Sequence, residues 1–222
     1  MKKNKFILFF LLILSIFLVF TFLTVARQTD SLGVFFHKSE KTATRWKNRF
    51  FDFIVNVDDH VLLLGDSHLA IHPWNDYIGT KSYNRAVSGF LIRNVNIDKF
   101  KGTPAAVVLS IGTNDIQFGR QQDRTVRELK RLFQDIQNKW PKSVFIYVSP
   151  PPPDVNLYEK FIRPKFPQIT RPTPSALNAL EACAKAEGFH VLHAKSAGID
   201  GLHIDPDSAK EIGRRIDELL EE

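Results

Sequence analysis

Apolar runs and amphipathic stretches alternate along the chain from Val61 to its C-terminus. Four of the runs are continuously apolar, which is typical of strands buried on both faces of a sheet, and they cover residues 61–64, 105–111, 144–148 and 190–192. Residues 82–86 form a weaker candidate strand. Because stretches with helical spacing separate the runs, the pattern predicts an α/β domain in which helices cover both faces of a parallel central sheet.

Three helices are expected between and after these runs. Thr173 and Pro174 have the residue types of an N-cap and a first helical turn, and Gly188 is expected to close that helix. Ser208 and Glu211 have the spacing of a capping box, which predicts the start of the last helix. The apolar residues at helical spacing are Val126, Leu129, Leu132, Phe133 and Ile136 in one helix and Ala209, Ile212, Ile216 and Leu219 in the last.

A long, proline-rich connection begins after the run at 144–148. It opens on four consecutive prolines at 150–153 and extends to about Arg171. Long loops at the carboxyl ends of strands tend to carry function, so we expect this connection to wall the substrate site.

The N-terminus has the pattern of a membrane anchor. Residues 6–26 are apolar apart from Ser15, Thr21 and Thr24, and a helix of this length crosses the ~30 Å hydrocarbon core of a bilayer. The three lysines before the stretch place the N-terminus in the cytoplasm and the rest of the chain in the periplasm or outside the cell. The small residues at 24–26 also fit a cleaved signal peptide, although such peptides usually have a shorter apolar region. Residues 1–27 are therefore interpreted as a single-pass signal-anchor, a transmembrane helix, with cleavage as the alternative.

The following segment, residues 28–56, mixes cations with aromatic residues. Trp46, Phe50 and Phe53 recur at helical spacing, which predicts a juxtamembrane helix with one apolar face. This face either packs on the domain or lies on the membrane surface. Residues 57–222 remain for the α/β domain.

Charge and cysteine content exclude several classes of protein. The formal net charge is +6, but residues 1–27 hold four cations and no acid, which leaves 26 − 24 = +2 for the rest. No basic stripe suits a phosphate backbone, so we expect no nucleic-acid partner. The single cysteine, Cys183, rules out an intramolecular disulfide and is expected to be a small core residue.

Polar motifs follow the predicted strands or precede the last helix. They are Gly65-Asp66-Ser67, the segment 84–89, Gly112-Thr113-Asn114-Asp115, and Asp200-Gly201-Leu202-His203. Ligands of open parallel sheets bind at the carboxyl ends of the strands, where the first of these motifs places the hydroxyl of Ser67.

In these four motifs the sequence resembles the SGNH (GDSL-type) hydrolases over residues 58–221. The resemblance implies a flavodoxin-like three-layer α/β/α fold and ester hydrolysis without a metal or cofactor. Carried over position by position, it implies Ser67 as nucleophile, Gly89 and Asn114 as oxyanion donors together with the Ser67 backbone, Asp200 as acid and His203 as base.

The chemistry of these residue types agrees with the implied roles. A serine hydroxyl is a poor nucleophile until a base takes its proton, which His203 would do while Asp200 holds its other ring nitrogen. Attack on an ester creates an oxyanion that backbone and side-chain N–H groups stabilise. The sequence thus predicts an extracytoplasmic serine esterase that acts on an acetylated glycan or a lipid ester through an acyl-Ser67 intermediate.

Two other functions stay open. Gly-Asp-Ser-His, with His68 after the nucleophile, resembles SGNH domains attached to membrane acyltransferases that modify cell-surface polysaccharides, so an O-acyltransferase is the first alternative. A non-catalytic, membrane-anchored binding module is the second. Ala86 departs from the family, many members of which have glycine there. His68 and His72 have the spacing of a zinc pair, but no nearby carboxylate or cysteine completes a ligand set, and no metal is expected.

Overall fold

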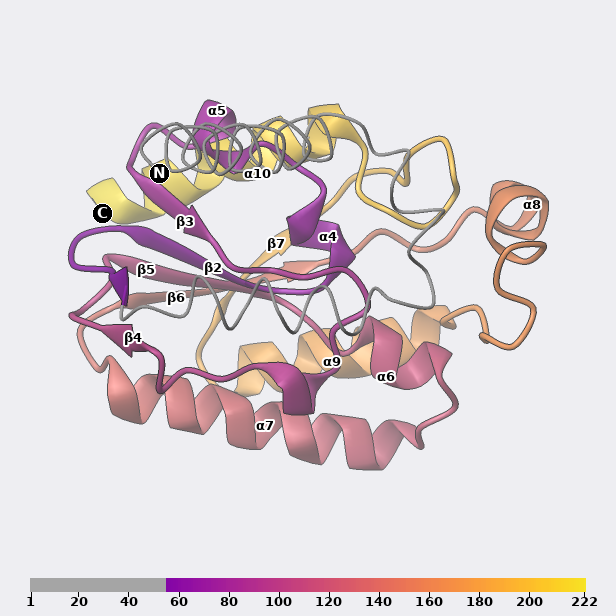
Figure 1. Ribbon diagram of the computed structural model, residues 1–222, viewed down its shortest axis with the longest axis horizontal. Coiled ribbons are helices and arrows are strands. Elements are labelled where there is room, and N and C mark those ends of the chain that lie inside the picture. The colour runs from indigo at the N-terminus through magenta and orange to yellow at the C-terminus, as the bar shows by residue number, and fades with distance from the viewer. Residues whose placement is uncertain (1–54) are drawn as a thin grey trace, which may run out of the picture. The chain divides into compact units, whose positions relative to one another are not determined.

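A five-stranded parallel sheet forms the centre of the protein in the computed structural model, which describes residues 55–222 (Figure 1). Its strand order is β3-β2-β5-β6-β7. The strands are β2 (Val61–Gly65), β3 (Ser82–Asn84), β5 (Ala106–Ser110), β6 (Val144–Ser149) and β7 (His190–His193). The predicted parallel α/β architecture is confirmed, and the order is that of flavodoxin-like folds, in which the chain reverses direction across the sheet between β2 and β5.

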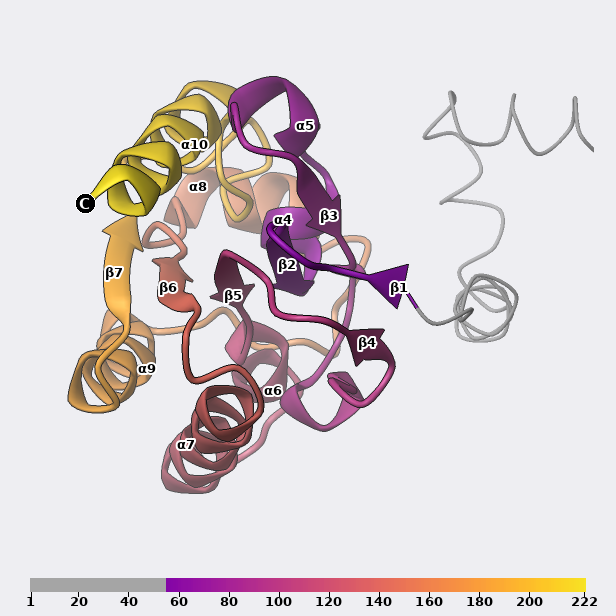
Figure 2. The same cartoon turned by 90° about the vertical axis from the view of Figure 1, so that its left-hand side faces the viewer.

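Helices cover both faces of the sheet, which gives the expected three layers (Figure 2). One face carries α4 (Ser67–Ala70), α5 (Trp74–Tyr77) and α10 (Pro206–Glu221), and the other carries α7 (Gln122–Lys139) and α9 (Pro174–Ala186). Alternate residues of each strand supply the two cores. Leu62 and Leu64 pack with α7 and α9, whereas Val61 and Leu63 pack with α10.

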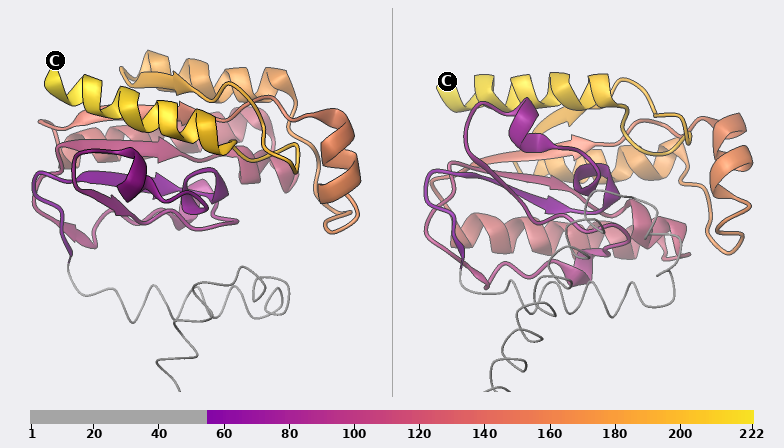
Figure 3. Two further views of the ribbon diagram at one scale, coloured as in Figure 1. Left: turned by 90° about the horizontal axis from the view of Figure 1, so that it is seen from above. Right: turned by 45° about the horizontal axis from the view of Figure 1, so that its top comes forward.

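The remaining elements are short. They are α6 (Thr113–Gln117), η1 (Ile92–Asn94), α8 (Val155–Leu157), η2 (Tyr158–Ile162), and a two-stranded parallel pair of β1 (Val55–Asn56) and β4 (Phe100–Lys101). The sequence pattern did not predict the β1–β4 pair. The proline-rich connection, residues 150–171, is called the strap below; it contains α8 and η2 and lies at the end of the sheet where the strands terminate (Figures 1 and 3).

Two details of the predicted elements were wrong. The last helix begins at Pro206 with Asp205 as N-cap, so Ser208 lies in the first turn and donates its hydroxyl to the carboxylate of Asp205. Asp205 is the N-cap, and not Ser208, because Pro206 is suited to the first helical position. The strand at β7 was expected to be buried, but it is an edge strand in which only Leu192 is buried. The start of α9 at Pro174, capped by Thr173, is confirmed, as is the burial of Cys183.

The predicted N-terminal anchor at 6–26 and the juxtamembrane helix around Trp46 lie outside the described residues. Between residues 55 and 222, no helix is both long enough and apolar enough to span a bilayer.

Candidate active site

Three of the predicted site residues form one hydrogen-bonded chain. Ser67 is the first residue of α4, directly beyond β2, and its Oγ lies 2.8 Å from Nε2 of His203. On the other side of the ring, His203 Nδ1 lies 2.5 Å from Oδ2 of Asp200. With its proton on Nδ1, the imidazole donates to Asp200 and accepts the Ser67 hydroxyl at Nε2, which is the arrangement that a serine nucleophile requires.

The turn at 198–203 explains why Asp200 and His203 can act together across three residues. Oδ1 of Asp200 accepts the backbone N–H groups of Leu202 and His203, both at 3.0 Å. The chain turns at Gly201, which has φ = +74°. One carboxylate oxygen therefore shapes the turn, and the other oxygen holds the imidazole.

Electrostatics keep Asp200 ionised. Burial alone would raise the pKa of Asp200, but the hydrogen bond and the charge of His203, with the two backbone N–H groups, lower it well below its usual range. A carboxylate at this position stabilises the imidazolium that forms when His203 takes a proton.

The residues around Ser67 are tightly packed. Gly65 has φ = +152°, and a Cβ at this position would lie 2.1 Å from the carbonyl oxygen of Ser110. Asp66 caps α4 by accepting the N–H of His68 at 3.1 Å. Its second carboxylate oxygen, Oδ2, has no hydrogen-bond partner in the described part of the chain, and burial raises the pKa of Asp66 to about 7. Ser67 is therefore held on a rigid turn beside a carboxyl group that resists ionisation.

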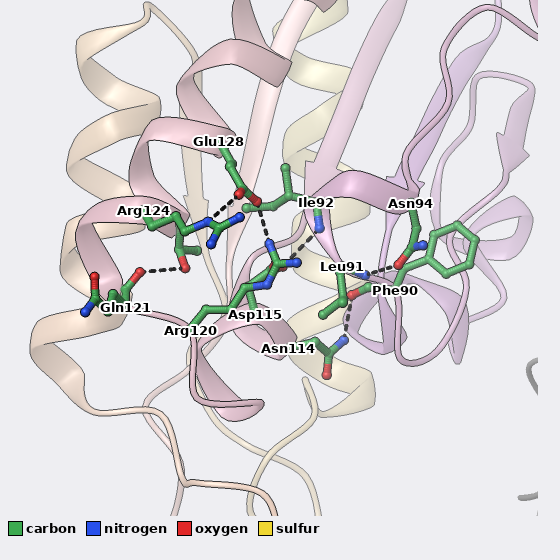
Figure 4. A network of polar contacts seen from close by, with 11 residues as sticks. Phe90, Leu91, Ile92, Asn94, Asn114, Asp115, Arg120, Gln121, Arg124 and Glu128 are labelled. Atoms are coloured by element: carbon green, nitrogen blue, oxygen red, sulfur yellow. Dashed lines mark hydrogen bonds and ion pairs between the residues drawn. The ribbon is translucent and has the colours of Figure 1, made fainter.

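The predicted oxyanion donors come from two neighbouring segments. Gly89 has φ = +80°, and Asn114 in α6 donates its side-chain Nδ2 to the carbonyl of Phe90 at 3.0 Å (Figure 4). An amide NH₂ has two hydrogens, so this bond fixes the amide plane and leaves a second N–H for another acceptor. Val87 N–H donates to the Gly65 carbonyl at 3.0 Å, which ties the Gly89 segment to the end of β2, two residues before Ser67. Ala86 fits this segment with a negative φ, so the family's glycine is not needed there.

The histidines near the nucleophile do not converge on a metal site. His68 is 2% exposed, its ring centroid is 5.5 Å from that of His203, and burial lowers the pKa of His68 to about 3. Nε2 of His72 instead lies 3.1 Å from the carbonyl of Ile204. Across residues 55–222 no group of three or more His, Cys, Asp or Glu side chains is placed to hold a metal ion.

The sequence pattern suggested that the strap lies near the site, but it did not predict two contacts that support the proposed residues. The strap packs on the 198–203 turn, because Asp154 N–H donates to the Gly201 carbonyl at 2.9 Å and Leu202 joins an apolar cluster with Tyr158 and Ile162. Asp115, next to Asn114, bonds the N–H of Ile92. Asp115 belongs to the polar motif that follows β5, but both contacts join segments that are distant in the sequence, and neither left a local signal.

Solved structures share this architecture. A protein described as a platelet activating factor from Streptococcus pneumonia matches with a TM-score of 0.67 and 18% identity, over 86% of this chain and 100% of its own. The lipase/acylhydrolase from Enterococcus faecalis has a TM-score of 0.53 and 18% identity, over 72% and 94%. The psychrotrophic esterase EstA from Pseudoalteromonas sp. has a TM-score of 0.51 and 15% identity, over 74% and 100%.

These likenesses establish the fold, which is that of the SGNH, or GDSL, hydrolases. No protein-family model and no curated protein matches the sequence.

Proposed function

We propose that this chain is a serine esterase in which Ser67 is the nucleophile, His203 the base and Asp200 the acid. The observation that carries the proposal is the hydrogen-bonded chain from Ser67 Oγ through both ring nitrogens of His203 to Asp200, at the carboxyl end of β2. It lies next to the point where the strand order reverses, which is the usual ligand site of such sheets.

The reaction follows from this geometry. His203 Nε2 takes the Ser67 proton as Oγ attacks the ester carbonyl carbon, and the resulting oxyanion is stabilised by the N–H groups of Ser67, Gly89 and Asn114. The tetrahedral intermediate collapses, the alcohol leaves with the proton from His203, and an acyl-Ser67 ester remains. Water, deprotonated by His203, then attacks the carbonyl carbon of this ester. The C–Oγ bond breaks, Ser67 Oγ takes back the proton from His203, and the carboxylic acid is released. Each oxyanion donor is expected to contribute about 3–4 kcal/mol in the transition state.

Apolar side chains around the site favour a lipid ester over an acetylated glycan as substrate. In the described region, the large hydrophobic residues with exposed side chains are Ile71, Phe118, Val155, Phe161 and Ile199. Each lies on a segment of the site or on the strap.

Two of these residues lie one helical turn after a residue of the proposed site. Ile71 N–H donates to the Ser67 carbonyl at 3.4 Å, and Phe118 N–H donates to the Asn114 carbonyl at 2.9 Å. Residues four apart share one face of a helical turn, so each apolar side chain projects on the side of its functional residue. Ile199, 92% exposed, immediately precedes Asp200. An apolar acyl chain attached to the reacting carbonyl would cover these side chains and remove them from water.

The proposed location rests on the sequence. The apolar stretch at 6–26 supports a single-pass anchor that holds the catalytic domain outside the cytoplasm, near lipid substrates. Fractionation and N-terminal sequencing of the mature protein test this: an intact N-terminus in the membrane fraction is expected, whereas an N-terminus at Arg27 would show cleavage.

Hydrolysis of a series of aryl esters tests the activity and the substrate class together. Wild-type protein is expected to hydrolyse acetyl, butyryl and octanoyl esters, with kcat/KM rising by up to about fourfold per buried methylene. Ser67→Ala and His203→Ala are expected to be inactive on all of them. Phe118→Ser should flatten the chain-length preference while activity on the acetyl ester persists. A wild-type protein that hydrolyses no ester contradicts the esterase, and one that hydrolyses acetyl esters alone contradicts the lipid substrate.

The same assay with a glycan acceptor separates hydrolysis from acyl transfer. His68, the residue that suggested a transferase, is 2% exposed and its ring lies beside that of His203, so it presents little surface to a glycan acceptor. We therefore expect free acid rather than acylated glycan as the product.

A further inference from the structure

Asp115 lies next to the proposed oxyanion donor Asn114 and is fully buried. Its carboxylate faces the segment that carries the other proposed donor, Gly89. Oδ2 of Asp115 accepts the N–H of Ile92 at 2.9 Å (Figure 4). Burying a carboxylate costs free energy unless the group is paired and hydrogen-bonded. The partners of Asp115 therefore indicate which segments it stabilises.

Two neighbouring residues of α6 hold the loop after Gly89 at two points. Asn114 donates to the carbonyl of Phe90 at 3.0 Å, and Asp115 accepts from Ile92, two residues further on. Asn94 closes the same loop by accepting the N–H of Leu91 at 2.9 Å. The segments that carry the two donors are thereby joined into one rigid unit, and the orientation of the Asn114 amide depends on this unit.

A charged network holds Asp115 from the opposite side. Nη1 of Arg120 lies 3.1 Å from Oδ1 of Asp115 and 2.5 Å from Oε2 of Glu128 in α7. Arg124, which is more exposed, pairs with Glu128 at 3.0 Å and does not contact Asp115. Burial raises the pKa of Asp115, and the Ile92 N–H and Arg120 oppose this shift. The network therefore has a buried end at Asp115 and a more exposed end at Arg124, and each end can be substituted without changing the other residue.

We infer that Asp115 is the positioning residue of the oxyanion site: through the Ile92 N–H it holds the 89–92 loop against α6, so that the Gly89 N–H and the Asn114 amide keep the geometry that stabilises the oxyanion. The inference rests on the proposed esterase function. It assigns no contact between Asp115 and the substrate; Asp115 acts through the donors.

Kinetics of Asp115 variants on a soluble aryl ester, well below Tm, test this role. Asp115→Ala leaves the Ile92 N–H without its acceptor and is expected to lower kcat by about 10–100-fold with little change in KM, because the donors act on the transition state and not on bound ester. Asp115→Asn keeps the side-chain volume, and its amide oxygen can still accept the Ile92 N–H. Its kcat should therefore stay within about threefold of the wild-type value. Should Asp115→Ala not fold, Asp115→Leu, which fills the space, replaces it with the same expectation. Arg124→Ala is the matched control and should behave as wild type.

A double-mutant cycle with Asn114→Ala separates positioning from general stability. If Asp115 acts through the donors, Asp115→Ala should cost much less kcat in the Asn114→Ala background than in wild type. Full additivity, wild-type kcat in Asp115→Ala, or an equal loss in Arg124→Ala would overturn the inference. Phosphonate labelling of Ser67 in wild type is run in parallel: failure there counts against the esterase itself, whereas a labelled, active wild type with an additive cycle counts against Asp115 alone.

Discussion

A single methyl group at Gly201 is predicted to disturb the acid and the base together. Gly201 lies between Asp200 and His203, and a Cβ at this position would lie 2.6 Å from Cβ of Leu157 and 2.7 Å from the backbone nitrogen of Tyr158. Ordinary contacts between heavy atoms are about 3.5 Å, so either the turn or the strap must move by roughly 1 Å. A misplacement of that size lowers kcat on the order of 10²-fold.

The same substitution should also destabilise the fold. Alanine at φ = +74° costs about 1–2 kcal/mol, and overpacking adds about 1–3 kcal/mol. Together these lower Tm by roughly 5–15 °C in a domain of this size. Gly198→Ala is the matched control, because a Cβ there meets its nearest atom, the His203 carbonyl oxygen, at an ordinary 3.5 Å.

Thermal melts and ester kinetics on both alanine variants check the prediction. Gly201→Ala is expected to lose kcat and Tm, and Gly198→Ala to keep both. Wild-type kcat in Gly201→Ala, or equal losses in the two variants, would refute the idea that the strap positions the catalytic turn.

Further predictions concern the acids and the buried histidine. Asp200→Asn should lower kcat about 10³–10⁴-fold with little change in KM, whereas Asp205→Ala should keep kcat and lose about 1 kcal/mol of stability as the cap of α10 disappears; a larger kcat loss at Asp205 would reverse the assignment. Burial lowers the pKa of His68 to about 3, so the folded protein does not bind the proton that the unfolded chain binds below about pH 6.5. Because of His68, wild-type stability therefore falls by up to about 1.4 kcal/mol for each pH unit below 6.5. Asp66, whose pKa is raised to about 7, has the opposite slope from pH 7 down to about 4. The stability of His68→Gln relative to wild type, from urea unfolding, should therefore rise as the pH falls from 6.5 to 4, and a constant difference would contradict the buried neutral imidazole.

The sheet was predictable because it leaves local signals, and the proposed triad residues were identified because they stand in short motifs that resemble those of the SGNH hydrolases. Continuous apolar runs identify β2, β5 and β6, and the turn from Asp200 to His203 is a local motif whose own backbone N–H groups shape it. The start of α10 also had a local signal, an Asp-Pro pair at 205–206, which the capping-box spacing at Ser208 outweighed.

Contacts between distant segments left no such signal. Asp115 and Ile92 are 23 residues apart, and the strap meets Gly201 across more than forty residues. The exposed apolar side chains near the site have no shared periodicity, since each belongs to a different loop or short helix. Elements as short as β1 and β4 depend on pairing rather than on residue pattern.

Covalent labelling of Ser67 tests the central claim most directly. An alkyl fluorophosphonate reacts with a serine only when a base activates it and donors stabilise the developing negative charge. Mass spectrometry of the digested wild-type protein is expected to find the adduct on the peptide that contains Ser67, with no adduct in Ser67→Ala and almost none in His203→Ala. A wild-type protein that stays unlabelled, or an adduct that persists in Ser67→Ala, would contradict the account.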